Sequence, residues 1–280
     1  MENIGKCAVR KVCCTEVKER LMQMSYQTIQ VKLTGNICFI KFIGINEKNC
    51  ITNTRIEEVK QVFENYQDIC NVIVLEGNDN YFCFGADFDA IGKNVSKGGN
   101  ISNNPAPLFD LWKIMTESSC IVISHVRGAV NAGGMGFVSA SDIVISSRHA
   151  VFSLSELLFG LMPAMVLPFL IRRIGFSKAN YLTLTTKPIN SETAYNWGLI
   201  DVCTDNSVVS LRQTLARLSK IPKDGILRYK RYMNKLRPVD LEERESAIDA
   251  NLEVFNDPVN LKRIADFSNK GIYPWEEEHE

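Results

Sequence analysis

The sequence predicts an α/β fold from three observations. Short apolar runs rich in β-branched residues alternate with amphipathic helical patterns over the first half of the chain, which is typical of mixed α/β domains. Apolar residues make up 45% of the 280 residues and charged residues 23%, so the chain can bury a sizeable core. No internal repeat of the length used by solenoid proteins is present.

The strands are predicted from alternation and from short apolar runs. Residues 26–33 alternate between apolar and polar side chains, 34–36 form a turn, and 37–42 continue as a second strand. Three further apolar runs predict buried strands, at 71–75, 121–124 and 143–145.

Helices fill the intervals between these strands and most of the second half. Asn53 and Thr54 are both suitable N-caps for a helix that continues to Tyr66. Residues 92–106, rich in Gly, Ser and Asn, are predicted as a loop, and an amphipathic helix with Trp112 on its apolar face follows. Beyond Pro163 the chain is predicted to be mainly helical. The strongest helical patterns there cover 165–174, 192–197, 207–219, 223–236 and 241–256.

Charge and cysteine content exclude several classes of protein. The 32 basic and 32 acidic residues cancel, which argues against a nucleic-acid binder. The nine cysteines show no C-x-x-C pair and no neighbouring histidine, which argues against a zinc site and a disulfide scaffold. So many free thiols favour a reducing cytoplasm.

The chain has no predicted membrane span or signal peptide. Its most apolar run, 157–171, is shorter than the ~20 residues that a span requires, and two prolines interrupt it. Charged residues interrupt positions 1–20, where a signal peptide would need an apolar core.

Three regions are expected along the chain. Residues 1–25 are expected to be an extension, because 1–23 differ in pattern from the rest and a second Met-Ser pair follows at Met24. Residues 1–23 are interpreted as loosely attached or as an upstream translation artefact, and an additional helix over 15–24 is an equally good interpretation. Residues 26–205 are predicted to form the core, and 206–280 a helical C-terminal region.

Two glycine-rich turns are candidates for a binding site. Residues 82–88 and 128–136 each follow a predicted strand or the loop beyond it, and small residues there allow the backbone to approach a bound group. Free N–H groups in such turns can stabilise developing negative charge. The alternative is that the glycines only permit tight packing, and one glycine cluster alone favours that alternative. The spacing is neither G-x-G-x-x-G nor that of a phosphate-binding P-loop.

Glu156 is a candidate acid–base residue. It is the only Asp, Glu, Lys or Arg between Arg148 and Arg172. A carboxyl group among apolar residues has a raised pKa and can exchange protons near neutral pH. The alternative is a glutamate that pairs with a helix N-terminus, and taken alone that alternative is the better supported.

Taken in order, these segments resemble the crotonase (enoyl-CoA hydratase/isomerase) superfamily over about residues 26–270. The matching segments are Phe84-Gly85-Ala86-Asp87, Arg127-Gly128 with Ala132-Gly133-Gly134, Ser141-Asp142-Ile143, the F-x-x-x-E-x-x-x-G-x-x-P pattern from Phe152 to Pro163, and Trp197-Gly198-Leu199-Ile200-Asp201. The resemblance implies a spiral of β-β-α turns with a helical C-terminal region, assembled as a trimer or as a pair of trimers. It also implies that the backbone N–H groups of Ala86 and Gly133 polarise a thioester carbonyl.

A closer resemblance is to one subgroup, the dehydratases of polyketide β-branching cassettes. The strings 82–88, 124–128, 131–134, 152–160 and 167–176 carry it. This subgroup removes water from a 3-hydroxy-3-methylglutaryl group on an acyl carrier protein to give a 3-methylglutaconyl group. No cofactor is implied, because the substrate is itself carried on phosphopantetheine or CoA. A general hydratase or Δ3-Δ2-enoyl-CoA isomerase, and a non-catalytic scaffold, are the alternatives.

The chain departs from ordinary hydratases at one catalytic position. Their first glutamate falls at Gly136 and their second at Glu156. One carboxyl can nevertheless run a syn elimination, by taking the α-proton and returning it to the departing hydroxyl.

Other residues are assigned by position in the resemblance. Phe84 and Asp87 are expected beside the substrate, and Asn131 and His125 are expected to assist. Arg127, in place of the family's usual Asn, is a candidate for the free carboxylate of the substrate, and a salt bridge with Asp142 is the alternative.

The basic segment 223–237 is a candidate surface for the phosphopantetheine phosphate or an acidic carrier protein, through Arg228, Lys230 and Arg231. A solvated helix face is the equally supported alternative. The apolar residues of the C-terminal region are expected to lie against neighbouring subunits; they include Leu252, Val254, Phe255, Ile264, Phe267 and Ile272.

Overall fold

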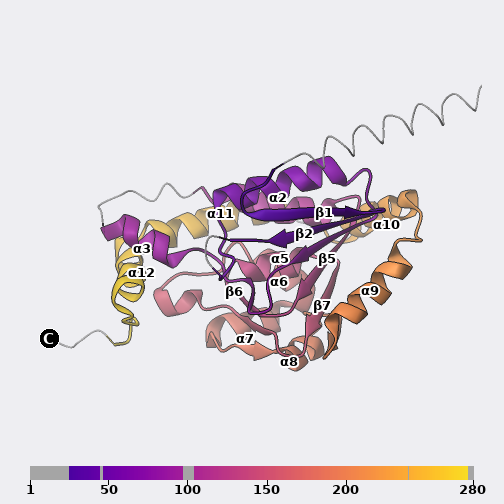
Figure 1. Ribbon diagram of the computed structural model, residues 1–280. Helices are drawn as coiled ribbons and strands as arrows, with labels where there is room; N and C mark the ends of the chain where they lie inside the picture. The colour runs from indigo at the N-terminus through magenta and orange to yellow at the C-terminus, as the bar shows by residue number, and fades with distance from the viewer. Residues whose placement is uncertain (1–24, 45–46, 97–103, 239, 277–280) are drawn as a thin grey trace, which may run out of the picture.

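The computed structural model describes residues 25–44, 47–96, 104–238 and 240–276 (Figure 1). The predicted extension lies outside these residues except for Ser25. Within them, strands and helices alternate as far as β10, and helices alone follow. The predicted α/β class is therefore confirmed, as is the helical character of the C-terminal part.

A six-stranded sheet forms the centre of the molecule, with the strand order β1-β2-β3-β5-β7-β10. β1 and β2 are an antiparallel hairpin, and every later strand runs parallel to its neighbours. The strands are β1 (Ile29–Thr34), β2 (Ile37–Phe42), β3 (Val72–Glu76), β5 (Ile121–Val126), β7 (Ile143–Ser147) and β10 (Val202–Thr204).

β1 begins three residues later than predicted for a local reason. The Glu58 carboxylate accepts hydrogen bonds from the backbone N–H groups of Gln27 and Thr28, at 2.5 and 2.9 Å. The N–H groups of these two residues therefore bond to the Glu58 side chain rather than to a neighbouring strand, while the Thr28 carbonyl accepts from the Ile43 N–H at 2.9 Å.

A second, smaller sheet has the order β4-β6-β8-β9. Its strands are β4 (Tyr81–Cys83), β6 (Ala129–Asn131), β8 (Val151–Ser153) and β9 (Ile189–Asn190). None of these strands was predicted, because segments of two or three residues show no periodicity. β4, β6 and β8 run parallel, so the chain leaves all three at the same edge.

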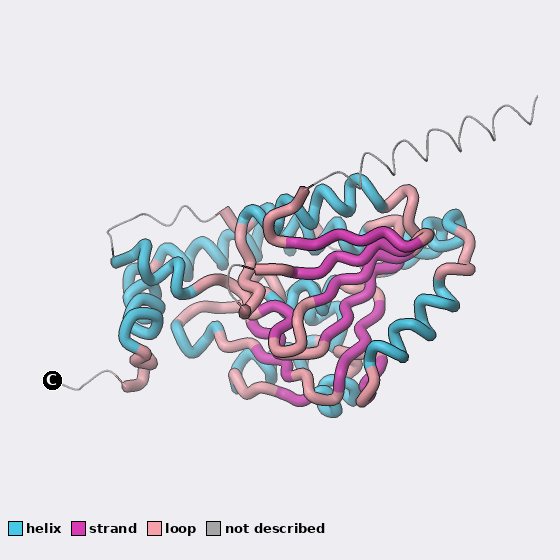
Figure 2. Tube along the Cα trace, viewed as in Figure 1, coloured by secondary structure: helices cyan, strands magenta, loops and turns pink. Residues whose placement is uncertain are grey.

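Helices surround the two sheets (Figure 2). They are α2 (Asn53–Tyr66), α3 (Phe88–Ser96), α4 (Ala106–Glu117), α5 (Gly134–Ala140), the 3₁₀ helix η1 (Glu156–Phe159), α6 (Leu167–Ile174), α7 (Phe176–Thr185), α8 (Ser191–Asn196), α9 (Ser207–Leu218), α10 (Lys223–Leu236), α11 (Leu241–Asn256) and α12 (Pro258–Lys270).

Three helix predictions need correction. The N-cap of α2 is Thr52, whose hydroxyl accepts from the Arg55 N–H at 3.1 Å, and not Asn53 or Thr54. The segment predicted as a loop from residue 92 is helical as far as Ser96, in α3. α7 and α12 were not predicted.

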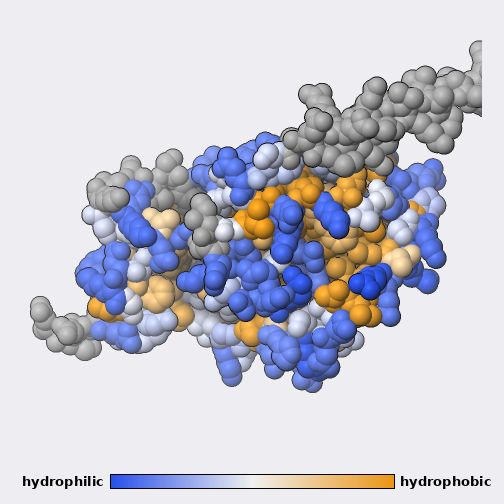
Figure 3. Space-filling model, in the orientation of Figure 1, coloured by the Kyte–Doolittle hydropathy of each residue, from blue (hydrophilic) through white to orange (hydrophobic). Residues whose placement is uncertain are grey.

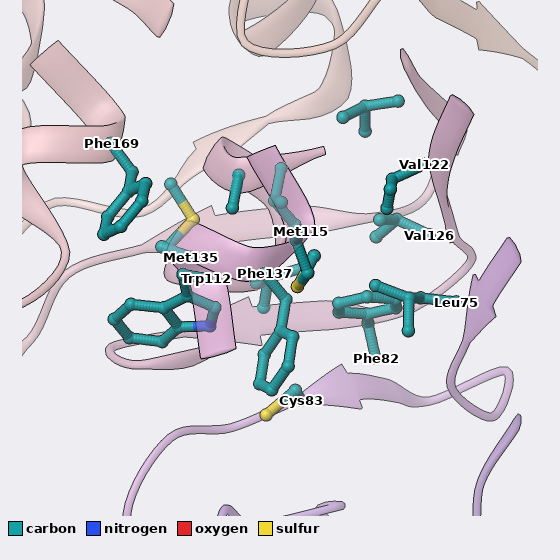
Figure 4. Packing of buried hydrophobic residues seen from close by; sticks show 14 of the residues in the cluster. Leu75, Phe82, Cys83, Trp112, Met115, Val122, Val126, Met135, Phe137 and Phe169 are labelled. Carbon is teal, nitrogen blue, oxygen red and sulfur yellow. The ribbon is translucent and has the colours of Figure 1, made fainter. Parts of the chain in front are cut away.

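The main core lies between the large sheet and the helices α2, α4, α5 and α6. Aromatic rings occupy its centre: Trp112 meets Phe137 and Phe169 edge-on, with ring centroids 5.8 Å apart in both pairs (Figure 4). The opposite face of the sheet is covered in part by α9 through Leu211 and Leu215. Figure 3 shows apolar surface on the face of the molecule that is turned toward the viewer in Figure 1.

Candidate active site

Two backbone turns meet at the edge where β4 and β6 end. Gly85 follows β4, and Ala132 and Gly133 follow β6. A Cβ atom built on Gly85 would lie 2.7 Å from the Ala132 Cβ and 3.1 Å from the Gly133 nitrogen. Gly85 also has φ +82°, a conformation that favours glycine. The parallel pairing of β4 with β6 therefore brings together two turns that the sequence separates by about fifty residues.

The Ala86 and Gly133 amides are available to an incoming group. Within the described residues, neither N–H donates a hydrogen bond. The Gly85 carbonyl accepts from the Ile51 N–H at 2.8 Å, and in a trans peptide the Ala86 N–H points the opposite way. Two unused backbone donors on adjoining turns can together bind an oxygen that carries negative charge.

Glu156 begins η1, directly after β8. β8 pairs with β6 in a register that places Ser153 opposite Asn131, so the loop with Glu156 leaves the small sheet beside the Gly133 turn. Glu156 is 8% exposed, and its Oε2 atom has no hydrogen-bond partner within the described part of the chain. Burial raises the pKa of Glu156 to about 7, although its own N–H and that of Ser155 act in the opposite direction.

Asn131 connects the Gly133 turn to the Glu156 loop. Its Oδ1 accepts from the Ser153 hydroxyl, and its Nδ2 donates to the Ser155 hydroxyl, both at 2.8 Å. The Ala132 N–H also donates to the Ser153 carbonyl at 3.1 Å. These contacts make Asn131 a positioning residue that fixes the turn relative to the carboxyl group.

Residues on either side of Ala86 make local contacts, and one of them reaches η1. The Asp87 carboxylate accepts from the Ala90 N–H at 3.1 Å at the start of α3. The Phe84 ring is half-buried and meets Tyr81 edge-on at 5.4 Å. Phe88 meets Phe159 of η1 edge-on at 5.1 Å, so aromatic packing joins the Ala86 turn to the element that carries Glu156.

His125 is not brought to this site. Its side chain is 1% exposed, with Nδ1 2.7 Å from Glu76 Oε1 and Nε2 3.0 Å from the Ser207 hydroxyl. Ser207 is the first residue of α9, so His125 lies on the sheet face that α9 covers. The imidazole of His125 links α9 to the sheet through these two contacts. The expectation that His125 assists at the substrate is therefore wrong.

Arg127 is also held elsewhere. Its Nε lies 3.2 Å from the Asp79 carboxylate, and its Nη2 donates to the Gly77 carbonyl at 3.2 Å. The alternative salt bridge with Asp142 is wrong as well, because Asp142 pairs with Lys230.

The predicted basic surface on α10 needs correction at Lys230. Lys230 is 5% exposed, and its Nζ lies 2.6 Å from Asp142 and 2.9 Å from the Cys120 carbonyl. It therefore cannot meet a carrier protein. Arg228 and Arg231 are exposed, and Arg228 lies 3.2 Å from Asp224.

α10 also lies far from Glu156 along the strands. Cys120 and Asp142, which contact Lys230, immediately precede β5 and β7, so α10 packs at the N-terminal ends of these parallel strands. The Ala86 and Gly133 turns follow β4 and β6, the short strands that come after β3 and β5 in the chain. In Figure 1, α10 accordingly lies at the opposite end of the strands from α3 and α12.

Gly136 leaves no room for the second carboxyl group of an ordinary hydratase. A Cβ atom at this position would lie 2.2 to 2.4 Å from three ring atoms of Trp112. Trp112 is fully buried, and its Nε1 has no hydrogen-bond partner among the described residues. The sequence predicted Trp112 only as a core residue, because its contact with Gly136 joins two separate helices.

The described residues hold no group of three or more His, Cys, Asp or Glu side chains placed to bind a metal ion. Among them there is also no helix with the length and apolar character needed to cross a bilayer.

Gly85→Ala is expected to lower kcat about tenfold or more, because the new methyl group would push the two turns apart and their amides would no longer converge. The measurement is steady-state turnover, with thermal unfolding as a check on the fold. Gly35→Ala is a matched control: Gly35 has φ +62° at the β1–β2 turn and open space around it. Equal losses of activity in the two variants would contradict a role for the Gly85 turn.

Comparison with known proteins identifies the family. A profile of the enoyl-CoA hydratase/isomerase family matches residues 32–280. The chain is 46% identical over 256 residues to the bacillaene synthase dehydratase PksH of Bacillus subtilis strain 168, covering 91% of this chain and 99% of PksH.

Solved structures agree with this match. The crystal structure of PksH, a putative polyketide biosynthesis enoyl-CoA hydratase, matches with a TM-score of 0.86 over 89% of this chain and all of that one. A putative enoyl-CoA hydratase from Mycobacterium avium paratuberculosis matches with a TM-score of 0.77 at 20% identity, over 90% of this chain and 100% of the other, which shows the fold alone. The predicted crotonase-like fold is confirmed, and the chain belongs to the enoyl-CoA hydratase/isomerase family.

Proposed function

We propose that this protein is a dehydratase that eliminates water from a 3-hydroxyacyl thioester. The observation that carries the proposal is the buried carboxyl group of Glu156, with a pKa of about 7, next to a turn that has a free backbone N–H. A carboxyl group with this pKa can take and give a proton at neutral pH. The identity with PksH, whose name describes a dehydratase, supports the same reaction.

The reaction needs only this chain's own groups. The Glu156 carboxylate removes the α-proton of the thioester, and the electron pair moves onto the carbonyl oxygen. The Ala86 and Gly133 N–H groups form the oxyanion hole that holds this enolate. The enolate then re-forms the carbonyl and expels the β-hydroxyl, which takes the proton from Glu156. An enoyl thioester and one water leave, and Glu156 is again a carboxylate.

The substrate proposed is the 3-hydroxy-3-methylglutaryl thioester of an acyl carrier protein, which becomes the 3-methylglutaconyl thioester in polyketide β-branching. Two lines support it: the resemblance to the β-branching dehydratases and the identity with a protein named for bacillaene synthase. The clash at Gly136 argues against a general hydratase that uses two carboxyl groups.

The direct experiment is to incubate the protein with 3-hydroxy-3-methylglutaryl carrier protein and follow the loss of one water by mass spectrometry. The proposal requires conversion to the 3-methylglutaconyl form. Hydration of crotonyl-CoA, or migration of a Δ3 double bond, without any loss of water from the glutaryl substrate would instead establish the hydratase or isomerase alternative.

A trimer or a pair of trimers is proposed on the family resemblance. Only part of the apolar set first expected at a subunit interface is covered within the chain, and Ile272 of that set is 36% exposed. Val254 and Ile264 are buried within the chain, and Phe255 and Phe267 pack against the same cluster. Large exposed apolar residues lie on α10 instead, among them Tyr229, Tyr232 and Leu236.

The carrier-protein thioester is expected to have a higher kcat/KM than the same acyl group on CoA. Reversing the exposed charges with Arg228→Glu and Arg231→Glu should lower kcat/KM for the carrier substrate at low salt and leave kcat unchanged. The effect should vanish at physiological ionic strength, where charges are screened over about 8 Å. α10 packs at the N-terminal end of β5, and a strand of six residues spans roughly 20 Å.

The measurement is kcat/KM for both thioesters at two salt concentrations. Equal values for CoA and carrier substrates at low salt would contradict the preference. An effect of the reversal that persists at physiological salt would mean that the carrier contacts α10 directly.

A further inference from the structure

α12 packs against both elements that flank the site. Phe267 of α12 meets Phe159 of η1 edge-on at 5.1 Å, and Phe159 in turn meets Phe88, the first residue of α3. α3 and α12 lie side by side (Figures 1 and 2). A Cβ atom at Gly92 of α3 would come within 2.8 Å of Ser268, so the two helices touch along their backbones.

Arg263 projects from α12 onto the end of η1. A Cβ atom built on Gly160, the residue after η1, would lie 2.6 Å from Arg263 Nη1 and 2.1 Å from Asn260 Oδ1. Asn260 is 5% exposed and fixed in place, because its Nδ2 donates to the carbonyls of Gly160 and Val254 at 3.0 and 3.1 Å. Arg263 is therefore held against the same short helix that begins with Glu156.

The guanidinium of Arg263 is largely unused. Its Nη1 donates to Asn260 Oδ1 at 3.0 Å, and within the described residues this is its one hydrogen bond. No carboxylate in that part of the chain forms an ion pair with it. A half-buried guanidinium with four N–H donors to spare is suited to bind a carboxylate in a bidentate manner.

The other cations on the helices that pack against η1 are less suitable. On α7, Lys178 donates to the Trp197 carbonyl at 3.3 Å. On α12, Lys270 pairs with Asp266 at 2.8 Å, and Lys262 is exposed. Arg127, the candidate from the sequence, is paired with Asp79. Lys178 and Arg263 are the half-buried cations of this set without a carboxylate partner in the described residues, and of the two only Arg263 has the planar guanidinium that binds a carboxylate in a bidentate manner.

We propose that Arg263 binds the terminal carboxylate of the acyl group and so selects a dicarboxylic substrate. The inference rests on the proposed function, since a 3-hydroxy-3-methylglutaryl thioester carries such a carboxylate. The η1 element then holds the acid–base group at its start and the carboxylate-binding cation at its end. Asn260 is the positioning residue that keeps the guanidinium beside η1.

The test compares Arg263→Gln with wild type on two carrier-bound substrates, 3-hydroxy-3-methylglutaryl and 3-hydroxy-3-methylbutyryl, which differ in the terminal carboxylate. Wild type should prefer the glutaryl substrate. Arg263→Gln should lower kcat/KM for that substrate about 10- to 100-fold and leave the butyryl substrate within a few-fold, because one charge-assisted contact is lost. Lys262→Gln, the exposed neighbouring cation, should change neither, and Arg263→Lys should restore part of the preference.

Binding of two unreactive analogues separates this inference from the proposed function. The Kd values of 3-methylglutaryl and 3-methylbutyryl carrier protein, which have no hydroxyl to eliminate, report recognition alone. A wild-type preference for the glutaryl analogue that Arg263→Gln removes would support Arg263 even if no water were ever lost, in which case only the dehydratase proposal fails. An equal loss for both acyl groups, no loss for either, or a wild type without preference would each overturn the role of Arg263.

Discussion

Glu156→Gln is expected to lower turnover by about 10² to 10⁴, because the amide can neither remove the α-proton nor return it to the departing hydroxyl. Glutamine has nearly the same size and shape, so the fold should persist. The wild-type kcat/KM should also rise with pH through about 7, because the reaction starts from the carboxylate form. The measurement is the rate of water loss from the carrier-bound substrate between about pH 5 and 9.

The same substitution should stabilise the folded protein at alkaline pH. A pKa of about 7 in the folded state, against about 4.3 in the unfolded chain, means that folding favours the protonated acid. The contribution of protonated Glu156 to the free energy of unfolding is therefore fully present below about pH 4 and is lost as the pH rises through about 7. Glutamine does not titrate, so at pH above about 8 the variant should exceed wild type by on the order of 4 kcal/mol in free energy of unfolding.

Glu64→Gln is the matched control, since Glu64 is an exposed glutamate on α2. It should change neither the rate nor the pH dependence of stability. Turnover by Glu156→Gln within a few-fold of wild type would remove Glu156 from the mechanism.

The long strands could be predicted from the sequence, and the short ones that build the site could not. β3 and β5 are runs of apolar residues buried on both faces, which is typical of central parallel strands. β4, β6 and β8 have three residues each, too few to show a period. Their parallel pairing nevertheless sets the Ala86, Gly133 and Glu156 loops at one edge.

The positions of site residues could be predicted from the sequence only where they depend on local features. The turns at Gly85 and Gly133 and the isolated Glu156 are local features, and the resemblance placed them in order. The partners of His125 and Lys230 are 82 and 88 residues away, so no local pattern indicated that these side chains are satisfied internally. One signal was available: Lys230 lies four residues after Ile226, on the buried face of α10.

Arg263 is a residue whose position no local sequence pattern could indicate. Nothing in its local pattern distinguishes it from Lys262 or Lys270, which share α12. Its position at the end of η1 depends on Asn260 reaching Gly160, a contact across 100 residues. Arg127 was therefore the cation predicted to bind the carboxylate, because it lies in a family motif. In the structure, the β3–β4 connection holds its side chain.

Gly136→Ala is expected to destabilise the protein by about 1–3 kcal/mol or more, because its methyl group would meet the Trp112 ring at 2.2 Å. The ring cannot move aside, since it is fully buried between Phe137 and Phe169 (Figure 4). The measurement is the free energy of unfolding in denaturant. Gly225→Ala on α10, where nothing lies within 4 Å of the added carbon, is the control and should be neutral or stabilising by up to about 1 kcal/mol.

The clash itself is tested by repeating Gly136→Ala in a Trp112→Leu background, where the smaller side chain leaves room for a methyl group. The penalty of the alanine should shrink there, giving a coupling energy in a double-mutant cycle. An undiminished penalty, or a Gly136→Ala variant as stable as wild type, would show that Trp112 does not exclude a side chain at this position. If the coupling is found, Gly136→Glu alone cannot restore a hydratase's second carboxyl group. The loss of that group is then built into the packing of α4 against α5, and the elimination depends on Glu156 alone.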